Sequence, residues 1–394
     1  MKFISYDLFE TLQQESLYMK RCTKCILPAD FPNIQFDKNG ICNYCHAWDK
    51  KWLDFDYDQA EKELVSIFDS ARSKRRKYDC LIPYSGGRDS SYVVYLCKNK
   101  YRLNPLAVTF NNLFMSSHAI RNIFNMSKIL NVDHVMVTYK PDILIKMYRS
   151  MITRGGEFCS ICTTGINYVK IIYQKLFKIP LMISGTSSRV DEQSPFEVTS
   201  THPLYVRKVL LESGFTLNEI NSFLIKRQYE LPAFEKIKIK LLDADYIQIN
   251  LPDYIRWDNM EIQEVLEKEL CWITPDKQKD HIDCRFAPIK YYLKNKQIPN
   301  FIFAQEKYSQ LIRDGQMTRV EALRSLNKKI ETESDEPEEL DDFLKFFNLD
   351  RKDIENKERK SHLDYVTKEE LEIKEDPLFK LMSIPWKMYK HLRN

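Results

Sequence analysis

The chain has 394 residues, of which 43% are hydrophobic and 12% aromatic, a composition typical of a folded protein with at least one sizeable core. Its 60 basic and 56 acidic residues leave a net charge of +4, which favours neither a nucleic-acid-binding protein nor one that binds an anionic membrane surface. No stretch has the pattern of a secretory signal or the length of a membrane span, so a cytoplasmic protein is expected.

Two Cys-x-x-Cys pairs follow the first residues of the chain. Each pair places two thiols on one side of a tight turn, and sixteen residues separate the pairs. Because zinc prefers a tetrahedral shell of four thiolates, the spacing predicts a structural zinc site, with four unrelated buried cysteines as the alternative. The predicted ligands are Cys22, Cys25, Cys42 and Cys45.

A glycine- and serine-rich loop lies between a predicted strand and a predicted helix. Residues 52–77 carry apolar side chains at helical spacing and predict one long helix, and residues 79–84 read as a buried parallel strand. Helical spacing resumes near Asp89. Between strand and helix, Gly86 and Gly87 let the main chain approach an anion, and the helix dipole stabilises negative charge at the same point. The loop therefore predicts a polyphosphate site, with a simple turn as the alternative.

The loop string Ser-Gly-Gly-Arg-Asp-Ser is not a Walker P-loop. It resembles the signature of the PP-loop ATP pyrophosphatases, which split ATP between its α and β phosphates and adenylate a substrate oxygen. The resemblance implies that the loop grips the pyrophosphate, that Asp89 holds magnesium and that Arg88 assists. The residues so implied in nucleotide binding are Ser85, Gly86, Gly87, Asp89, Ser90 and Ser91.

Further strands and helices alternate after the loop. Strands are predicted at 106–110, 134–139 and 180–184, with a helix at 119–130. This alternation predicts an α/β fold with a doubly wound, mostly parallel sheet, whose ligands bind at the carboxyl ends of the strands. Gly185 and Thr186 end the last of these strands and are expected to contact the nucleotide, with a turn as the alternative.

A third group of cysteines lies between and beyond these strands. Cys159 and Cys162 introduce a helix, whose N-terminal dipole favours a thiolate. Cys284 is distant in sequence, but the fold could return it to the same edge of the sheet. The trio resembles the cluster ligands of PP-loop sulfur-transfer enzymes, which implies an iron–sulfur cluster; a second zinc or plain packing of thiols is the alternative.

The last third of the chain is predicted to be mainly helical. Asp253 and Trp257 precede an apolar stripe and either cap a helix or close the substrate side of the pocket. A capping box predicts a helix at 318–326, and the acidic stretch 331–339 is expected to be a linker. The predicted organisation is a leader arm at 1–19, a zinc module at 20–50, an ATP-binding domain at 51–250, a helical substrate-side subdomain at 251–330 and an acidic linker with a charged helical tail at 331–394.

Taken in order, these motifs resemble the N-acetyl sugar amidotransferase family of bacterial surface-polysaccharide (LPS O-antigen) biosynthesis. The stretches that carry the likeness are Cys22–Pro28, Gly40–Cys45, the loop, Cys159–Cys162, Asp253–Trp257 and Asp283–Phe286. The resemblance implies an enzyme that uses ATP, Mg²⁺ and structural Zn²⁺ to convert the acetamido group of a nucleotide-linked sugar into an acetamidino group. It further implies a partner glutaminase that supplies ammonia. Nucleic acid is not expected as a partner.

Two other functions fit parts of the sequence. A tRNA thiolation enzyme would keep the adenylation chemistry and use the Cys159, Cys162 and Cys284 trio for sulfur transfer. A zinc-stabilised scaffold would use the nucleotide loop to regulate partner binding.

Overall fold

The computed structural model describes residues 20–155, 158–191, 202–224, 246–274, 283–297, 303–333 and 336–355. The expected leader arm at 1–19 and the tail beyond residue 355 lie outside the described residues.

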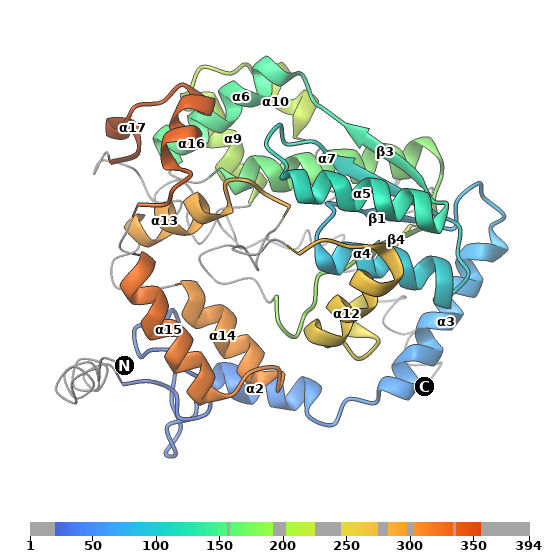
Figure 1. Cartoon of the computed structure of the whole chain (residues 1–394), viewed down its shortest axis with the longest axis horizontal. Coiled ribbons are helices and arrows are strands. Elements are labelled where there is room, and N and C mark those ends of the chain that lie inside the picture. The colour runs from blue at the N-terminus through green and yellow to red at the C-terminus, as the bar shows by residue number, and fades with distance from the viewer. Residues whose placement is uncertain are drawn as a thin grey trace, which may run out of the picture.

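The centre of the fold is a five-stranded sheet in which every pair of neighbours is parallel (Figure 1). Its strands are β1 (Cys80–Pro83), β2 (Pro105–Phe110), β3 (Asp133–Val137), β4 (Leu181–Ser184) and β5 (Ile247–Asn250), in the order β3-β2-β1-β4-β5. The chain therefore moves outward from β1 on one side and then crosses to the other. This reversal leaves a crevice at the carboxyl ends of β1 and β4, which is the usual ligand site of such sheets.

The four strands predicted from sequence are confirmed, with ends shifted by at most two residues. The sequence did not indicate β5. Only Ile249 of its four residues is buried, so the strand has too short an apolar pattern to stand out.

Successive side chains of the central strands enter two separate cores. Leu106 and Val108 pack in one core, while Ala107 packs in the other. Helices that cover the Ala107 face are α3 (Tyr57–Ser73), α4 (Arg88–Tyr95), α5 (Ser117–Leu130) and α12 (Asn259–Leu270). Helices that cover the opposite face are α6 (Pro141–Ser150), α7 (Cys159–Leu176), α9 (Pro203–Glu212) and α10 (Leu217–Phe223). Both faces are buried, as parallel sheets require, and the doubly wound α/β prediction is confirmed.

The helix predicted at 52–77 is confirmed as α3, but it starts later and ends earlier than expected. Trp52 belongs to the end of a separate helix, α2 (Asn43–Trp52), and α3 starts where the Asp56 side chain accepts a hydrogen bond from Gln59 N at 2.9 Å. Arg75 then adopts a left-handed φ of 49°, which ends the helical segment before the basic residues that were expected to extend it.

The C-terminal helices pack against two parts of the body. They are α13 (Ala287–Gln297), α14 (Phe303–Arg313), α15 (Arg319–Glu333), α16 (Leu340–Phe347) and α17 (Arg351–Glu355). Helices α14 and α15 lie beside α2 and the four-cysteine module (Figure 1). Phe343 and Phe347 of α16 are fully buried in the core under α6 and α7, so this part of the tail belongs to the body.

Two local predictions in this region have different outcomes. Thr318 and Glu321 form the predicted capping box, with Glu321 N donating to Thr318 Oγ1 at 3.2 Å and Thr318 N donating to the Glu321 carboxylate at 2.8 Å. The acidic stretch at 331–339 is not wholly a linker, because α15 continues to Glu333. Among the helices that the structure describes, none has the length and apolarity to cross a bilayer.

Candidate functional site

The glycine loop between β1 and α4 is pressed against α5. Gly86 has a φ of +81°, and a Cβ at this position would lie 2.4 Å from the backbone oxygen of Ala119. Gly87 is the N-cap of α4, and a Cβ there would lie 3.3 Å from Ser85 Oγ. Only glycine satisfies both the backbone angle and the space at residue 86. The loop therefore sits at the carboxyl end of β1 with the free N–H groups of α4 behind it.

The three serines of the loop have different surroundings. Ser85 and Ser90 are half-buried, with their hydroxyl oxygens 3.4 Å apart, and Gly87 N donates to Ser85 Oγ at 3.3 Å. Ser91 is fully buried and donates from Oγ to Gly87 O at 2.7 Å. The Ser85 and Ser90 hydroxyls are thus placed where a bound anion could reach them, whereas Ser91 supports the loop from the protein interior.

The carboxylate of Asp89 is held by a tryptophan from a distant segment. Trp257 is 4% exposed, and its Nε1 donates to Asp89 Oδ1 at 3.2 Å. The Arg88 guanidinium lies 3.1 Å from the same carboxylate, which remains 37% exposed. From the sequence, Trp257 was expected either to belong to a helix cap or to close the substrate side of the pocket. The structure instead places the ring in the core, edge-on to Tyr92, where its contribution to the site is to orient Asp89.

A second tryptophan of the same region holds the loop backbone. Trp272 Nε1 donates to Gly86 O at 3.2 Å, and Asn122 Nδ2 donates to the same oxygen at 3.3 Å. Asn122 also accepts from Ile273 N at 2.9 Å. Trp257 precedes α12 and Trp272 follows it, so the two indoles that hold the loop flank this one helix. Sequence reasoning missed Trp272 and Asn122, because no local motif connects residues that meet only through tertiary packing.

The end of β4 also lies against the loop. A Cβ at Gly185 would lie 3.1 Å from the backbone carbonyl of Asp89, so the turn after β4 touches the first turn of α4. Thr186 N donates to Ser184 Oγ at 3.1 Å within that turn. Asp253 lies farther along the same edge and accepts from Ser188 N at 2.7 Å and from Ser188 Oγ at 2.6 Å.

One carboxylate beside the loop was quoted in the sequence only as part of a motif. The Cγ atom of Asp283 lies 3.9 Å from the position that a Cβ of Gly87 would occupy. Its backbone is fixed by Ser116 N, which donates to Asp283 O at 3.1 Å. Asp283 therefore adds a second carboxylate to the crevice that contains Asp89.

The three cysteines of the second group lie near Tyr148, whose hydroxyl contacts Cys162 and interacts electrostatically with Cys159 and Cys284. Cys162 Sγ lies 3.1 Å from Tyr148 Oη, and Cys159 begins α7 as predicted. Cys284 is brought to the same edge by a backbone bridge to Met115. Burial raises the pKa of the Cys284 thiol, and the neighbouring Cys162 raises it further. These three sulfurs do not form a set within 4.8 Å of one another, in contrast to the four-cysteine group, which is the one such set among the described residues.

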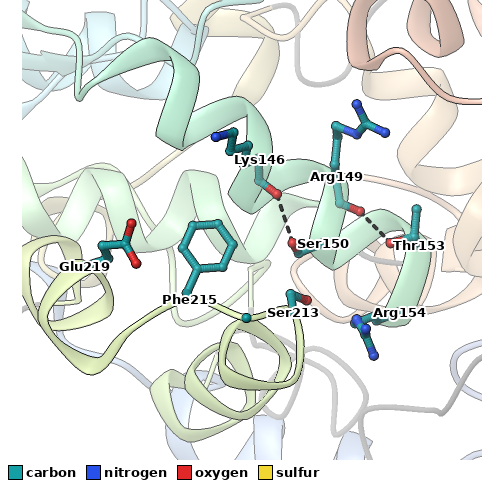
Figure 2. Close-up of a pocket in the computed structure, with 9 residues that line it drawn as sticks. Lys146, Arg149, Ser150, Thr153, Arg154, Ser213, Phe215 and Glu219 are labelled. Atoms are coloured by element: carbon teal, nitrogen blue, oxygen red, sulfur yellow. Dashed lines mark hydrogen bonds between the residues drawn. The ribbon is translucent and has the colours of Figure 1, made fainter.

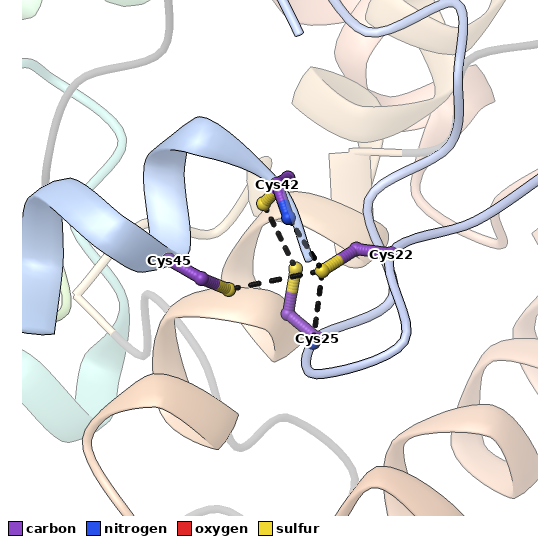
Figure 3. A group of neighbouring side chains, drawn as sticks. All are labelled: Cys22, Cys25, Cys42 and Cys45. Carbon is purple, nitrogen blue, oxygen red and sulfur yellow. Dashed lines mark hydrogen bonds between the residues drawn. The ribbon is translucent and has the colours of Figure 1, made fainter. Parts of the chain in front are cut away.

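The four predicted zinc ligands meet as one closed group (Figure 3). All four residues are fully buried, and the sulfur–sulfur distances are 3.9 Å for Cys22 and Cys45 and 3.8 Å for Cys25 and Cys42. A tetrahedron with zinc–sulfur bonds of about 2.3 Å has edges of about 3.8 Å, whereas a disulfide would need about 2.05 Å. The arrangement fits one tetrahedral metal ion and excludes disulfides.

Backbone hydrogen bonds and charge support the same interpretation. Cys42 N and Cys25 N donate to Cys22 Sγ at 3.2 and 3.4 Å, as expected for a thiolate. Hydrogen bonds from the other three thiols lower the pKa of Cys22, while bonds to Cys22 raise the pKa of Cys42 and Cys45. A bound cation would stabilise all four thiols as thiolates by supplying positive charge at the centre of the group.

The four-cysteine module docks on the C-terminal helices. Arg319 Nε donates to Cys25 O at 3.1 Å, and Ile26 N donates to Ser309 Oγ at 3.3 Å. Trp48 of the module donates to Arg189 O at 3.3 Å, which joins the module to the segment after β4. The module thus contacts both the C-terminal helices and the edge of the sheet where the loop lies.

A cavity of about 470 Å³ lies away from the loop, between α6 and the turn that joins α9 to α10 (Figure 2). Lys146, Arg149 and Arg154 lie on the α6 side, and Phe215 and Glu219 lie on the other. Glu219 is engaged in a capping box with Thr216. The cavity contains none of the predicted site residues.

Parts of the chain are similar in sequence to known proteins. The family described as LPS biosynthesis protein WbpG-like, C-terminal domain, matches residues 286–382. The uncharacterized protein MJ1599 of Methanocaldococcus jannaschii is 28% identical over 166 residues, which is 42% of this chain; the chain spans 58% of that relative's length.

Two solved structures give weak overall superpositions. The NH3-dependent NAD synthetase of Campylobacter jejuni is 14% identical, with 57% of this chain and 100% of that chain covered and a TM-score of 0.29. The U34-tRNA thiolase NcsA of Methanococcus maripaludis, solved with its [4Fe-4S] cluster, is 13% identical, with 75% of this chain and 88% of that chain covered and a TM-score of 0.31.

Proposed function

We propose that this protein is an ATP-dependent sugar amidotransferase that forms AMP and pyrophosphate. Its substrate would be a nucleotide-linked N-acetyl sugar, and its product an acetamidino sugar for the O-antigen of lipopolysaccharide. The observation that carries the proposal is the crevice itself: a glycine loop at the N-terminus of α4, beside the carboxylate of Asp89. The match of residues 286–382 to a domain of LPS biosynthesis proteins supports the pathway.

The chemistry needs activation because an amide carbonyl is a poor electrophile. The acetamido oxygen attacks the α-phosphorus of ATP, the bond between the α-phosphorus and the bridging oxygen breaks, and pyrophosphate leaves. Ammonia then adds to the carbon of the O-adenylyl imidate, and AMP leaves with the former amide oxygen. The net change is replacement of the acetamido oxygen by nitrogen.

The residues of the crevice have separate tasks in this scheme. The N–H groups at the start of α4, with the Ser85 and Ser90 hydroxyls, bind the pyrophosphate as its charge increases. Arg88 lies beside Asp89, and its guanidinium would stabilise the negative charge of the departing pyrophosphate. The half-exposed carboxylate of Asp89 and that of Asp283 are the oxygen donors that Mg²⁺ prefers, and the ion would neutralise phosphate charge there.

Two further parts complete the proposal. Ammonia must arrive unprotonated and shielded from water, which favours delivery by a docked glutaminase over uptake from bulk solvent.

The closed four-thiolate shell has no open position for substrate, so its metal, which we expect to be Zn²⁺, would be structural. Because ATP and nucleotide sugars are cytoplasmic metabolites, we place the protein in the cytoplasm.

The direct test is incubation of the full chain with ATP, Mg²⁺, ammonium salt at high pH and a panel of N-acetyl sugar nucleotides. The expected products are AMP and pyrophosphate in equal amounts, with an acetamidino sugar seen by mass spectrometry. The Asp89→Asn variant should abolish AMP formation, and Ser150→Ala, in the cavity between α6 and α10, is the matched control. Formation of ADP and phosphate without AMP would contradict the scheme.

A tRNA thiolation enzyme is the second candidate, favoured by the convergence of three cysteines on Tyr148. The sulfurs of Cys159, Cys162 and Cys284 share one edge of the sheet without closing into a single-ion shell, which suits ligands that bind different irons of a cluster. The small net charge of +4 argues against a large RNA substrate. Anaerobic purification followed by iron, sulfide and bound-RNA analysis separates the two functions.

A further inference from the structure

We infer that a cavity between α3 and β5 binds the sugar ring of the substrate, an inference that rests on the proposed function for its class of ligand. The cavity has a volume of about 480 Å³ and lies between the start of α3 and the residues from β5 to Tyr254. This volume is within the range of about 300–1,000 Å³ that is usual for small-molecule sites. None of the residues that line it belongs to the glycine loop.

The cavity lies beside β5, two strands away from β1 and its glycine loop, at the same edge of the sheet. Asn250, which lines it, is the register partner of Ser184 on β4. The next residue on β4 is Gly185, which touches the backbone of Asp89. Asp253 also lines the cavity, and Trp257, four residues later, donates to the Asp89 carboxylate. The lining is thus linked through β4 to the backbone of Asp89 and through Trp257 to its carboxylate, and a ring bound here must direct its acetamido group toward the loop for the proposed reaction.

The polar groups of the cavity suit the hydroxyl groups of a sugar. Gln248 and Asn250 provide two primary amides, and Glu63 and Asp253 provide two carboxylates. Planar amides and carboxylates can bond two neighbouring hydroxyls at once, because each hydroxyl both donates and accepts. Asp253 is held in place by its two short bonds from Ser188, so its remaining lone pairs have a defined direction.

The apolar groups and the charge point to the same ligand. Phe55 and Tyr254 form walls on which the C–H face of a pyranose can pack. Of the lining residues that the structure describes, Lys51 is the one cation, and its Nζ lies 4.4 Å from the centre of the Trp52 ring. Two carboxylates and one cation disfavour a phosphate in this cavity, so the cavity suits the neutral ring and leaves the phosphates to other parts of the crevice.

The test measures binding of UDP-N-acetylglucosamine, UDP-N-acetylgalactosamine and free N-acetylglucosamine to the full chain by calorimetry, without ATP. Phe55→Ala and Gln248→Ala should each weaken the binding of the ligand that the wild type prefers by about tenfold or more. Phe215→Ala is the matched control, because it truncates a half-buried aromatic ring in the cavity of similar size between α6 and α10. It should change the affinity by less than about twofold. Gln248 is exposed, so its variant keeps the test valid if Phe55→Ala folds poorly.

Three results would overturn the inference. These are an equal effect of the Phe215 and Phe55 variants, a loss of ATP affinity in the Phe55 variant without loss of sugar affinity, and failure of the wild type to bind any of the three probes. The outcome is separable from that of the proposed reaction. Sugar binding that depends on Phe55 without AMP formation would sustain the cavity and refute the reaction, whereas AMP formation with an unchanged KM for the sugar in both variants would do the reverse.

Discussion

The clearest physical test of the nucleotide loop compares two glycines with the same backbone angle and different surroundings. Gly86 has a φ of +81° and Gly214 a φ of +87°. Replacement of either by alanine costs about 1–2 kcal/mol for the left-handed conformation. At Gly214 nothing lies within 4 Å of the new Cβ, so the cost ends there. At Gly86 the new Cβ would lie 2.4 Å from the backbone oxygen of Ala119, so the loop or the start of α5 must move.

We estimate the additional cost at Gly86 as about 1–3 kcal/mol, the usual penalty for overpacking a buried site. The Gly86→Ala variant should therefore melt roughly 1–4 °C below Gly214→Ala in a thermal scan at matched concentration and pH. Titration with ATP and Mg²⁺ is the second measurement, and only the Gly86 variant should lose affinity, because the displaced loop no longer aims its N–H groups at the phosphates. Equal melting temperatures for the two variants would refute the conclusion that the loop is pressed against α5. Wild-type ATP affinity in Gly86→Ala would refute its role in binding.

Three further predictions concern the tryptophan that holds Asp89, a half-buried histidine of β3 and the four-cysteine group. Trp257→Phe removes the indole bond to the Asp89 carboxylate, worth about 1.5–3 kcal/mol, and should lower kcat for AMP formation by roughly ten- to a hundredfold. Phe215→Ala, which truncates an aromatic ring in the cavity between α6 and α10, should leave kcat unchanged, and equal rates in the two variants would contradict the assignment. Burial lowers the pKa of His134 from 6.5 to about 4, so the unfolded chain binds the proton more tightly than the folded chain. About 3 kcal/mol of stability should therefore be lost as the pH falls from 6.5 to 4. Denaturant midpoints should show a smaller loss in this window for His134→Gln, and the same dependence of the midpoint on pH in variant and wild type would exclude His134 as the cause. Cys42→Ser should reduce bound metal, measured by elemental analysis, from about one ion per chain to well below one and lower the melting temperature; full retention of metal would contradict the four-thiolate site.

Contacts of Arg189 connect the four-cysteine module to the segment that follows β4. Arg189 and Asp314 form an ion pair at 3.7 Å in which both side chains are at least nine-tenths buried. Trp48 of the four-cysteine module donates to the backbone of the same Arg189. Loss of the metal would therefore loosen a segment that is only four residues from Gly185 and its contact with Asp89.

The amino-acid sequence by itself determined those features whose physical cause is local. The strand, glycine turn and helix around Gly86 follow from neighbouring residues, and the two Cys-x-x-Cys pairs specify a four-thiolate shell through their spacing. Strands β1, β2 and β4 were predictable because their runs of apolar residues are buried on both faces, and β3, which is partly exposed, was predictable from its β-branched and apolar residues. The break before α3 was missed because it depends on one capping side chain, Asp56, inside an otherwise helical pattern.

Only the tertiary structure decided which residues support and surround the loop. Trp257 and Trp272 are separated from Gly86 by more than a hundred residues, and nothing in their local sequence distinguishes an indole that donates to the loop from one that fills a core. The inward direction of Ser91 and the approach of Asp283 to Gly87 likewise depend on how the chain returns to the edge of the sheet. Local spacing determines backbone conformation, whereas long-range packing determines which side chains meet, and a binding site requires both.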